Sequence, residues 1–195
     1  NPNWRAGVYV GQLEGDLDVT GFARGVQNYA AGSNDLRSQF LAGYATWRNA
    51  NGLYVDSVLQ GGRLRYTAQP AAAASAEGKG SSVLASVELG QALQVAPGWT
   101  VEPQLQLASQ HVDVDDLAIA GATVQQDNDS TWLARIGVRV KGEVATSAGL
   151  LQPYARVNVY RRSSGTDIAP FIGPAASTRI VSSTGGTSTG LGGGA

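Results

Sequence analysis

The sequence predicts an all-β fold, an antiparallel up-and-down transmembrane β-barrel that occupies the whole chain, residues 1–195. Three observations predict this fold class. Apolar and polar residues alternate with period two over long segments, short and long connections alternate between those segments, and tryptophans gather near the predicted strand ends. This combination is typical of strands that face lipid on one side and a polar interior on the other.

The clearest strand pattern lies between Trp132 and Val140, where Ile136 alternates with Arg135 and Arg139. Because successive side chains of a strand point to opposite faces, this segment has one apolar and one basic face. The predicted strands cover residues 4–10, 38–48, 53–67, 82–94, 99–111, 132–140 and 151–161, with the glycine-rich segment 177–195 as an eighth, weaker candidate. Both faces of 38–48 carry apolar side chains, so the pattern does not assign its lipid-facing side.

The connections between these segments alternate in length. The short ones, residues 49–52, 96–98 and 147–149, contain Asn-Gly, Pro-Gly and Ala-Gly pairs that suit tight turns. The long ones cover residues 15–37, 68–80, 112–129 and 162–176. Barrels of bacterial outer membranes have short periplasmic turns and longer extracellular loops, which is the alternation expected here.

The tryptophans fit two membrane interfaces. Trp4, Trp47 and Trp99 fall near the short-turn end of their strands, with Tyr54 beside them, and Trp132 falls near the opposite end. Amphipathic rings settle where lipid meets water, so these four tryptophans are the predicted interface aromatics.

The polar faces of the predicted strands would line the barrel interior. The residues expected there are Glu88, Glu102, Gln104, Arg135, Arg139 and Arg156. Unpaired buried charge is costly, so the arginines are expected to pair with the glutamates, although the sequence does not say which pairs form. A glycosidase-like carboxylate pair formed by Glu88 and Glu102 is the alternative, and the charge network is favoured over it.

Other chemistry finds little support in the sequence. The absence of cysteine excludes thiolate metal sites and a cysteine nucleophile, and the only histidine, His111, is interpreted as a residue at a strand end. The acidic residues Asp113, Asp115, Asp116, Asp127 and Asp129 lack the spacing of a calcium loop, so a solvated loop is expected. The net charge is −1 and no basic stripe is present, so no nucleic-acid partner is predicted. No cofactor, metal or enzymatic activity is expected.

Several short stretches resemble the translocator β-domain of autotransporters, of the pertactin-like and serum-resistance adhesin type. They are Arg5-Ala-Gly-Val-Tyr-Val-Gly11, Phe40-Leu-Ala-Gly-Tyr-Ala-Thr-Trp47, Val87-Glu-Leu-Gly90, Trp99-Thr-Val-Glu-Pro-Gln-Leu105 and Leu151-Gln-Pro-Tyr-Ala-Arg156, together with the segment 53–63. The resemblance implies a twelve-stranded barrel in the bacterial outer membrane, with about eight strands in this chain. It also implies a passenger upstream, outer-membrane lipid around the barrel, and the outer-membrane barrel assembly machinery as a partner.

Two other interpretations stay open at this point. A soluble ligand-binding barrel would place the apolar faces inward and the polar faces in water, and alternation alone does not say which face points out. A small outer-membrane porin would share the fold but have no passenger. The alternating connections, the tryptophan positions and the family-like motifs favour the translocator.

Overall fold

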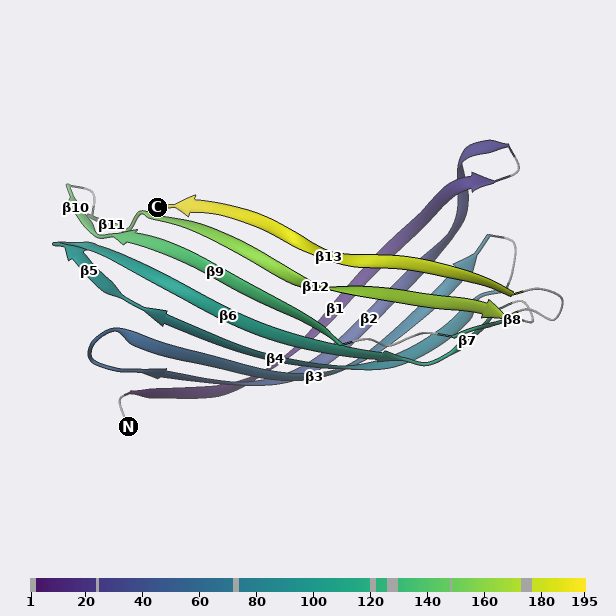
Figure 1. The fold of residues 1–195 in the computed structure, drawn as a ribbon, viewed down its shortest axis with the longest axis horizontal. Helices are drawn as coiled ribbons and strands as arrows, with labels where there is room; N and C mark the ends of the chain where they lie inside the picture. The colour runs from purple at the N-terminus through teal and green to yellow at the C-terminus, as the bar shows by residue number, and fades with distance from the viewer. Residues whose placement is uncertain are drawn as a thin grey trace.

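A computed structural model describes residues 3–23, 25–71, 74–119, 122–125, 130–147, 149–172 and 177–195. The described chain forms an open, curved antiparallel sheet with the shape of a trough (Figure 1). Within these residues, no helix has the length and apolar character needed to cross a membrane. The half-barrel confirms the predicted all-β fold class.

Eight long strands build the wall of the trough. They are β1 (Trp4–Ala23), β2 (Val26–Arg48), β3 (Leu53–Pro70), β4 (Ala76–Gln91), β6 (Trp99–Val114), β9 (Thr131–Gly142), β12 (Tyr154–Ile172) and β13 (Ser177–Gly194). Five short strands accompany them: β5 (Leu93–Ala96), β7 (Leu117–Ile119), β8 (Ala122–Val124), β10 (Val144–Thr146) and β11 (Gly149–Leu151). Each predicted strand corresponds to one of the long strands, including the weak candidate at 177–195.

The long strands follow one another in chain order around the trough. The order is β1-β2-β3-β4-β6-β9-β12, with β13 paired to β12, and every neighbouring pair is antiparallel. Within the described residues, β1 pairs only with β2 and β13 only with β12, so these two strands form the open edges of the sheet. This meander is the up-and-down connectivity that the alternation of short and long connections predicted.

Much of the sequence predicted to form the long connections belongs instead to the strands themselves. Residues 15–23 and 26–37 continue the β1–β2 ladder, in which Asp16 pairs with Asp35 and Asp18 with Ser33. The link 162–176 is likewise mostly strand, because β12 continues to Ile172. The apolar residues of β1 lie on one face up to Val10 and on the opposite face after it. A prediction that follows one apolar face therefore ends this strand near Val10, although the strand continues to Ala23.

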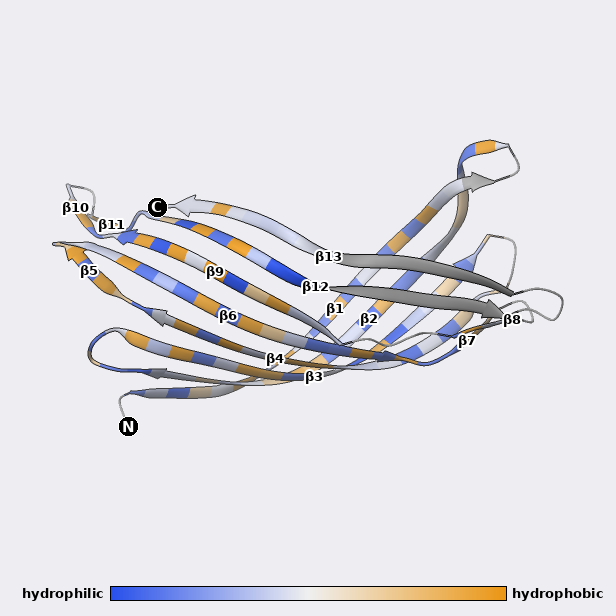
Figure 2. Cartoon of the chain, viewed as in Figure 1, coloured by the Kyte–Doolittle hydropathy of each residue, from blue (hydrophilic) through white to orange (hydrophobic). Residues whose placement is uncertain are grey.

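The strand register defines two faces of the sheet. One row of residues in register crosses all eight long strands: Trp4, Trp47, Val55, Leu89, Leu105, Ile136, Val159 and Thr189. Its members are mostly apolar, and Ile136 is 65% exposed. We call this the convex face. Figure 2 shows apolar and polar residues alternating along the strands. The register also places Leu41 and Trp47 of the ambiguous segment 38–48 on this face.

The opposite, concave face brings side chains together across intervening strands. The Tyr54 hydroxyl of β3 contacts Gln104 of β6, although β4 lies between these two strands. Such contacts form on the inside of a curved sheet because side chains converge there. Side chains on the outside of the curve point away from one another. Accordingly Tyr54, Glu102 and Asn158 are almost completely buried.

Candidate functional site on the concave face

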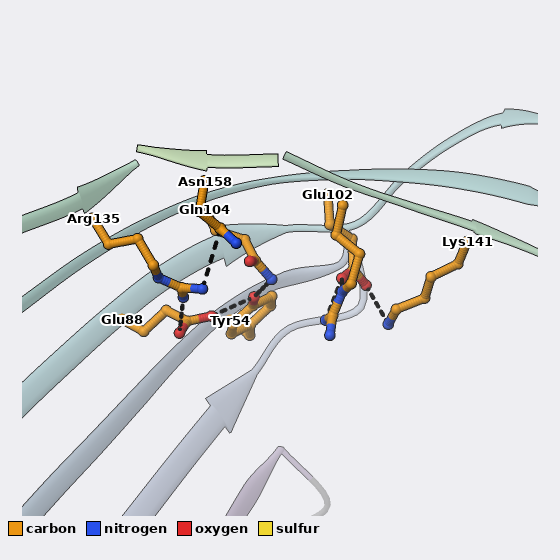
Figure 3. A network of polar contacts seen from close by, with 8 residues as sticks. Tyr54, Glu88, Glu102, Gln104, Arg135, Lys141 and Asn158 are labelled. Carbon is orange, nitrogen blue, oxygen red and sulfur yellow. Dashed lines mark hydrogen bonds and ion pairs between the residues drawn. The ribbon is translucent and has the colours of Figure 1, made fainter. Parts of the chain in front are cut away.

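The first part of the site is a hydrogen-bonded cluster around Glu88 of β4. Arg135 of β9 forms an ion pair with Glu88 at 2.5 Å and reaches Asn158 of β12 at 3.4 Å. The Tyr54 hydroxyl donates to the second Glu88 oxygen at 2.9 Å and accepts a hydrogen bond from Gln104 at 2.8 Å. Five strands, β3, β4, β6, β9 and β12, are therefore joined by one set of polar contacts (Figure 3).

The second part of the site surrounds Glu102 of β6. One carboxylate oxygen of Glu102 accepts hydrogen bonds from Arg139, at 2.7 Å from Nε and 2.5 Å from the terminal nitrogen. The other oxygen accepts a hydrogen bond from Lys141 Nζ at 2.9 Å. The Glu102 side chain is only 3% exposed, whereas Arg139 and Lys141 are 33% and 43% exposed. Glu102 is thus a buried anion held between two cations that retain contact with solvent.

The concave face accommodates these side chains because large residues alternate with glycines across it. One row in register reads Tyr54, Gly90, Gln104, Gly137, Asn158 and Gly190. A Cβ atom added at Gly90 would collide with the Tyr54 ring, and one added at Gly137 would collide with the Asn158 amide oxygen. Tyr54 and Asn158 therefore each lie over a glycine of the neighbouring strand, which leaves room for their polar groups to reach their hydrogen-bond partners.

We expect Gly90→Ala to lower the stability of the folded chain by about 1–3 kcal/mol, because overpacking at a tight site forces side chains or backbone to move. The Tyr54 ring occupies the space that the new methyl group needs, and its hydroxyl is fixed by Glu88 and Gln104. Unfolding by urea in lipid micelles, followed by tryptophan fluorescence, measures the effect.

Gly61→Ala is the matched control for this substitution. Gly61 also lies within a long strand, but a Cβ atom added there meets nothing within 4 Å. The control is expected to be neutral or slightly stabilising, since alanine restricts the unfolded chain more than glycine does. Equal effects at Gly90 and Gly61 would show that the fit between ring and glycine does not matter.

The structure brings together five of the six polar residues that the sequence pattern selected. Glu88 meets Arg135, Glu102 meets Arg139, and Gln104 joins the Glu88 cluster through Tyr54. Arg156 also lies on the concave face, opposite Arg139, but it has no ion-pair partner among the described residues.

The four predicted interface aromatics all lie on the convex face. Trp4 and Trp47 stand opposite each other in register, and Trp99 lies toward the same end of the sheet. Trp132 stands opposite Ser109, several residues further along β6. Trp4, Trp99 and Trp132 are all 40% exposed or more.

The list of predicted polar residues omits Tyr54 and Asn158, two members of the cluster around Glu88. Tyr54 was expected beside the tryptophans, but it lies on the concave face and is 2% exposed. Its position in the alternation gave the signal, because Tyr54 follows Leu53 and precedes Val55, a convex-face residue. The sequence assigns no role to Asn158, because its contact with Arg135 depends on the register between β9 and β12.

The remaining candidates from the sequence are His111 and the acidic residues between Asp113 and Asp129. The Nδ1 atom of His111 lies 3.1 Å from the Ser130 hydroxyl. No group of three or more histidine or carboxylate side chains in those ranges could hold a metal ion. The candidates Asp127 and Asp129 lie outside the described residues.

Comparisons with known proteins agree on one family. The sequence model of the Autotransporter beta-domain family matches residues 1–195. The pertactin autotransporter of Bordetella bronchiseptica is 30% identical over 83% of this chain, and the BrkA autotransporter of Bordetella pertussis is 26% identical over 79% of it. The matched regions cover 17% and 15% of those two proteins, so the chain corresponds to a small part of their length.

A solved structure shows the same fold. The crystal structure of the beta domain of the Bordetella autotransporter BrkA superposes with a TM-score of 0.58 and 18% sequence identity. The match covers 95% of this chain and 88% of that one. At this level of identity, the likeness establishes the architecture alone.

Proposed function

Because the chain belongs to the autotransporter β-domain family, we propose that it forms part of the wall of an outer-membrane pore that exports and anchors an upstream passenger. In this proposal the concave face lines the pore and the convex face contacts lipid. The family is one of translocator domains and not a catalytic family, and we propose that this chain likewise has no enzymatic activity of its own.

The polarity of the two faces is the observation that carries the proposal. Buried charged and amide groups, such as Glu102 and Asn158, lie on the concave face. Large apolar side chains, such as Leu105 and Ile136, lie on the convex face and are at least half exposed. This arrangement suits a barrel that has lipid outside and polar groups inside.

The soluble ligand-binding barrel would need the opposite arrangement. In such a protein the ligand cavity is mostly apolar and the outer surface is polar. A water-exposed convex face would instead carry a continuous apolar row from Trp47 to Val159, which is larger than soluble monomers usually expose. A porin without a passenger remains the second membrane candidate, and family membership favours the translocator over it.

The absence of cysteine allows a direct test of the two faces, since any introduced thiol is then unique in the chain. Leu105→Cys and Gln106→Cys are neighbours that project from the convex and concave faces. In cells, we expect a water-soluble maleimide to modify Gln106→Cys but not Leu105→Cys, because lipid excludes the reagent. Mass spectrometry of the purified protein measures the modified fraction.

The reversed labelling pattern would contradict the lipid-facing assignment and favour the soluble barrel. Equal labelling at both positions would place both faces in water and would also overturn the proposal. Export is tested separately, by detecting an epitope inserted upstream of Asn1 at the surface of intact cells.

The family membership also supports the proposed location and partners. We propose residence in the bacterial outer membrane and insertion by the outer-membrane barrel assembly machinery, with outer-membrane lipid against the convex face. The exposed tryptophans on this face support that placement, because amphipathic rings prefer the membrane–water interface.

A further inference from the structure

A row of cations crosses the convex face on β2, β3 and β4. Arg37 stands opposite Arg65, and Arg65 stands opposite Lys79. Arg63 lies on the same face of β3, two residues before Arg65, opposite Gln39. All four residues are exposed. We call these four residues the basic row.

The basic row begins where the apolar part of the convex face ends. Along β3 this face carries Leu59, which is 62% exposed, then Gly61, and then Arg63 and Arg65. The same change occurs on β1, where Val10 is followed on this face by Gln12. The row therefore marks the level at which the proposed lipid contact gives way to a polar environment.

Most of the charge in this row has no counterion within the described residues. Arg37 forms an ion pair with Glu14 at 2.9 Å, and both side chains are more than half exposed. Arg63, Arg65 and Lys79 form no ion pair with any described residue. Like charges directly opposite each other destabilise a sheet, so such a row breaks a local rule of strand pairing. Natural proteins break such local rules at functional sites and compensate for the cost elsewhere.

Acidic residues lie close to the basic row, and most of them are further from the apolar surface than the cations are. A depression of about 770 Å³ is lined by Arg37, Arg65 and Lys79, together with carboxylates that include Asp35 and Glu77. Asp35 and Glu77 lie two residues further from the apolar surface than Arg37 and Lys79. Glu14, the ion-pair partner of Arg37, also lines the depression and lies at the level of Arg37 in the register. Arg65 and Lys79 therefore lie nearer to the apolar surface than Asp35 and Glu77 do, and among the carboxylates that line the depression only Glu14 lies at the level of the cations.

We propose that Arg63, Arg65 and Lys79, with Arg37 beside them, bind a phosphate group of an anionic membrane lipid headgroup, in which no choline cation neutralises the phosphate. The proposal rests on the proposed function, because it takes the convex face to be the lipid-facing side. A phosphate at this level would place negative charge between like charges that otherwise repel each other. Arginine suits the role because its planar guanidinium group can donate two hydrogen bonds to one phosphate, and lysine adds a point charge.

The test uses the complete gene product that carries residues 1–195, folded into two kinds of vesicle. One contains only zwitterionic phosphatidylcholine, and the other contains in addition lipid A, a glycolipid with two phosphate groups. A ligand that binds only the folded state raises its unfolding temperature. We expect lipid A to raise the unfolding midpoint by roughly 5 °C. In the variant Arg65→Gln/Lys79→Gln, most of this rise should be lost.

The charge-matched control is Arg5→Gln/Arg156→Gln, which removes two cations from concave-face positions of β1 and β12. It should keep the full rise with lipid A, which separates a local site from a general effect of net charge. A rise that is absent in the unmodified protein, or equal in the two double variants, would overturn the site.

A third arm identifies the source of the phosphate. Inorganic phosphate is added to the protein in phosphatidylcholine vesicles, and it should raise the midpoint far less than lipid A does. An equal rise that also requires Arg65 and Lys79 would overturn the assignment to a lipid headgroup. A protein that inserts into neither vesicle would contradict the proposed function itself, and the site with it. Insertion without any dependence on lipid A would overturn the site alone.

Discussion

Ile136→Arg is expected to prevent assembly of the sheet in the outer membrane. Ile136 is 65% exposed on the convex face, with Leu105 and Val159 opposite it on the two neighbouring strands. An arginine on the lipid-facing side costs about 2–4 kcal/mol near the bilayer midplane. This is a large part of the 5–15 kcal/mol that stabilises a typical folded protein. The fraction of protein in the outer membrane that resists protease and migrates as a folded species measures the effect.

Ala118→Arg is the control for the same charge change. Ala118 lies in the short strand β7, which belongs to the connection that follows β6 and precedes β9 along the chain, and its side chain is exposed. We expect this variant to assemble like the unmodified protein, because its new charge stays in water. If both variants assembled equally well, the assignment of the convex face to lipid would be wrong.

Glu102→Gln is expected to lower stability by about 1.5–3 kcal/mol, because the charged hydrogen bonds that a buried carboxylate accepts from two cations are lost. Arg139 and Lys141 lie two residues apart on one face of β9, and the Glu102 carboxylate separates their charges. Without it, the two cations repel each other and each loses an anionic hydrogen-bond acceptor. Equilibrium unfolding in urea measures the loss.

Glu14→Gln removes a carboxylate of the same kind from an exposed ion pair. Glu14 and Arg37 are 58% and 64% exposed, and exposed ion pairs contribute about 0–1 kcal/mol. We therefore expect the loss at Glu14 to be much smaller than the loss at Glu102. Losses of similar size would indicate that Glu102 is as well solvated in the barrel as a surface carboxylate.

The grouping of residues into two faces could be predicted from sequence because it depends on period-two alternation, and the up-and-down strand order could be predicted from the alternating short and long connections. The period-two signal is strong in β9, where Arg135 and Arg139 alternate with Ile136 and Val138. The strand ends could not be predicted in the same way. The apolar residues of β1 change face after Val10, so the long β1–β2 hairpin resembled an irregular loop.

The network could be predicted only in part, for a different reason. Alternation places Glu102 and Arg139 on the same face, but it does not say which residues stand opposite each other. The pairing depends on the register between β6 and β9, which is set by contacts along both strands. The role of Tyr54 depends in addition on a glycine in another strand, Gly90, and no local pattern links the two.

The fit of aromatic rings over glycines bears on how strands find the correct partner positions. In lipid, apolar residues on the convex face gain little by choosing one apolar neighbour over another, so that face distinguishes poorly between alignments shifted by two residues. The concave face distinguishes the native alignment from the shifted ones, because a ring fits only over a glycine. A shift of two residues between β3 and β4 would place Tyr54 against Glu88 or Ala92 in place of Gly90. The rings of Phe40 over Gly11 and Tyr44 over Gly7 impose the same condition between β1 and β2. Alignments shifted by two residues are therefore disfavoured by steric clash at several strand pairs.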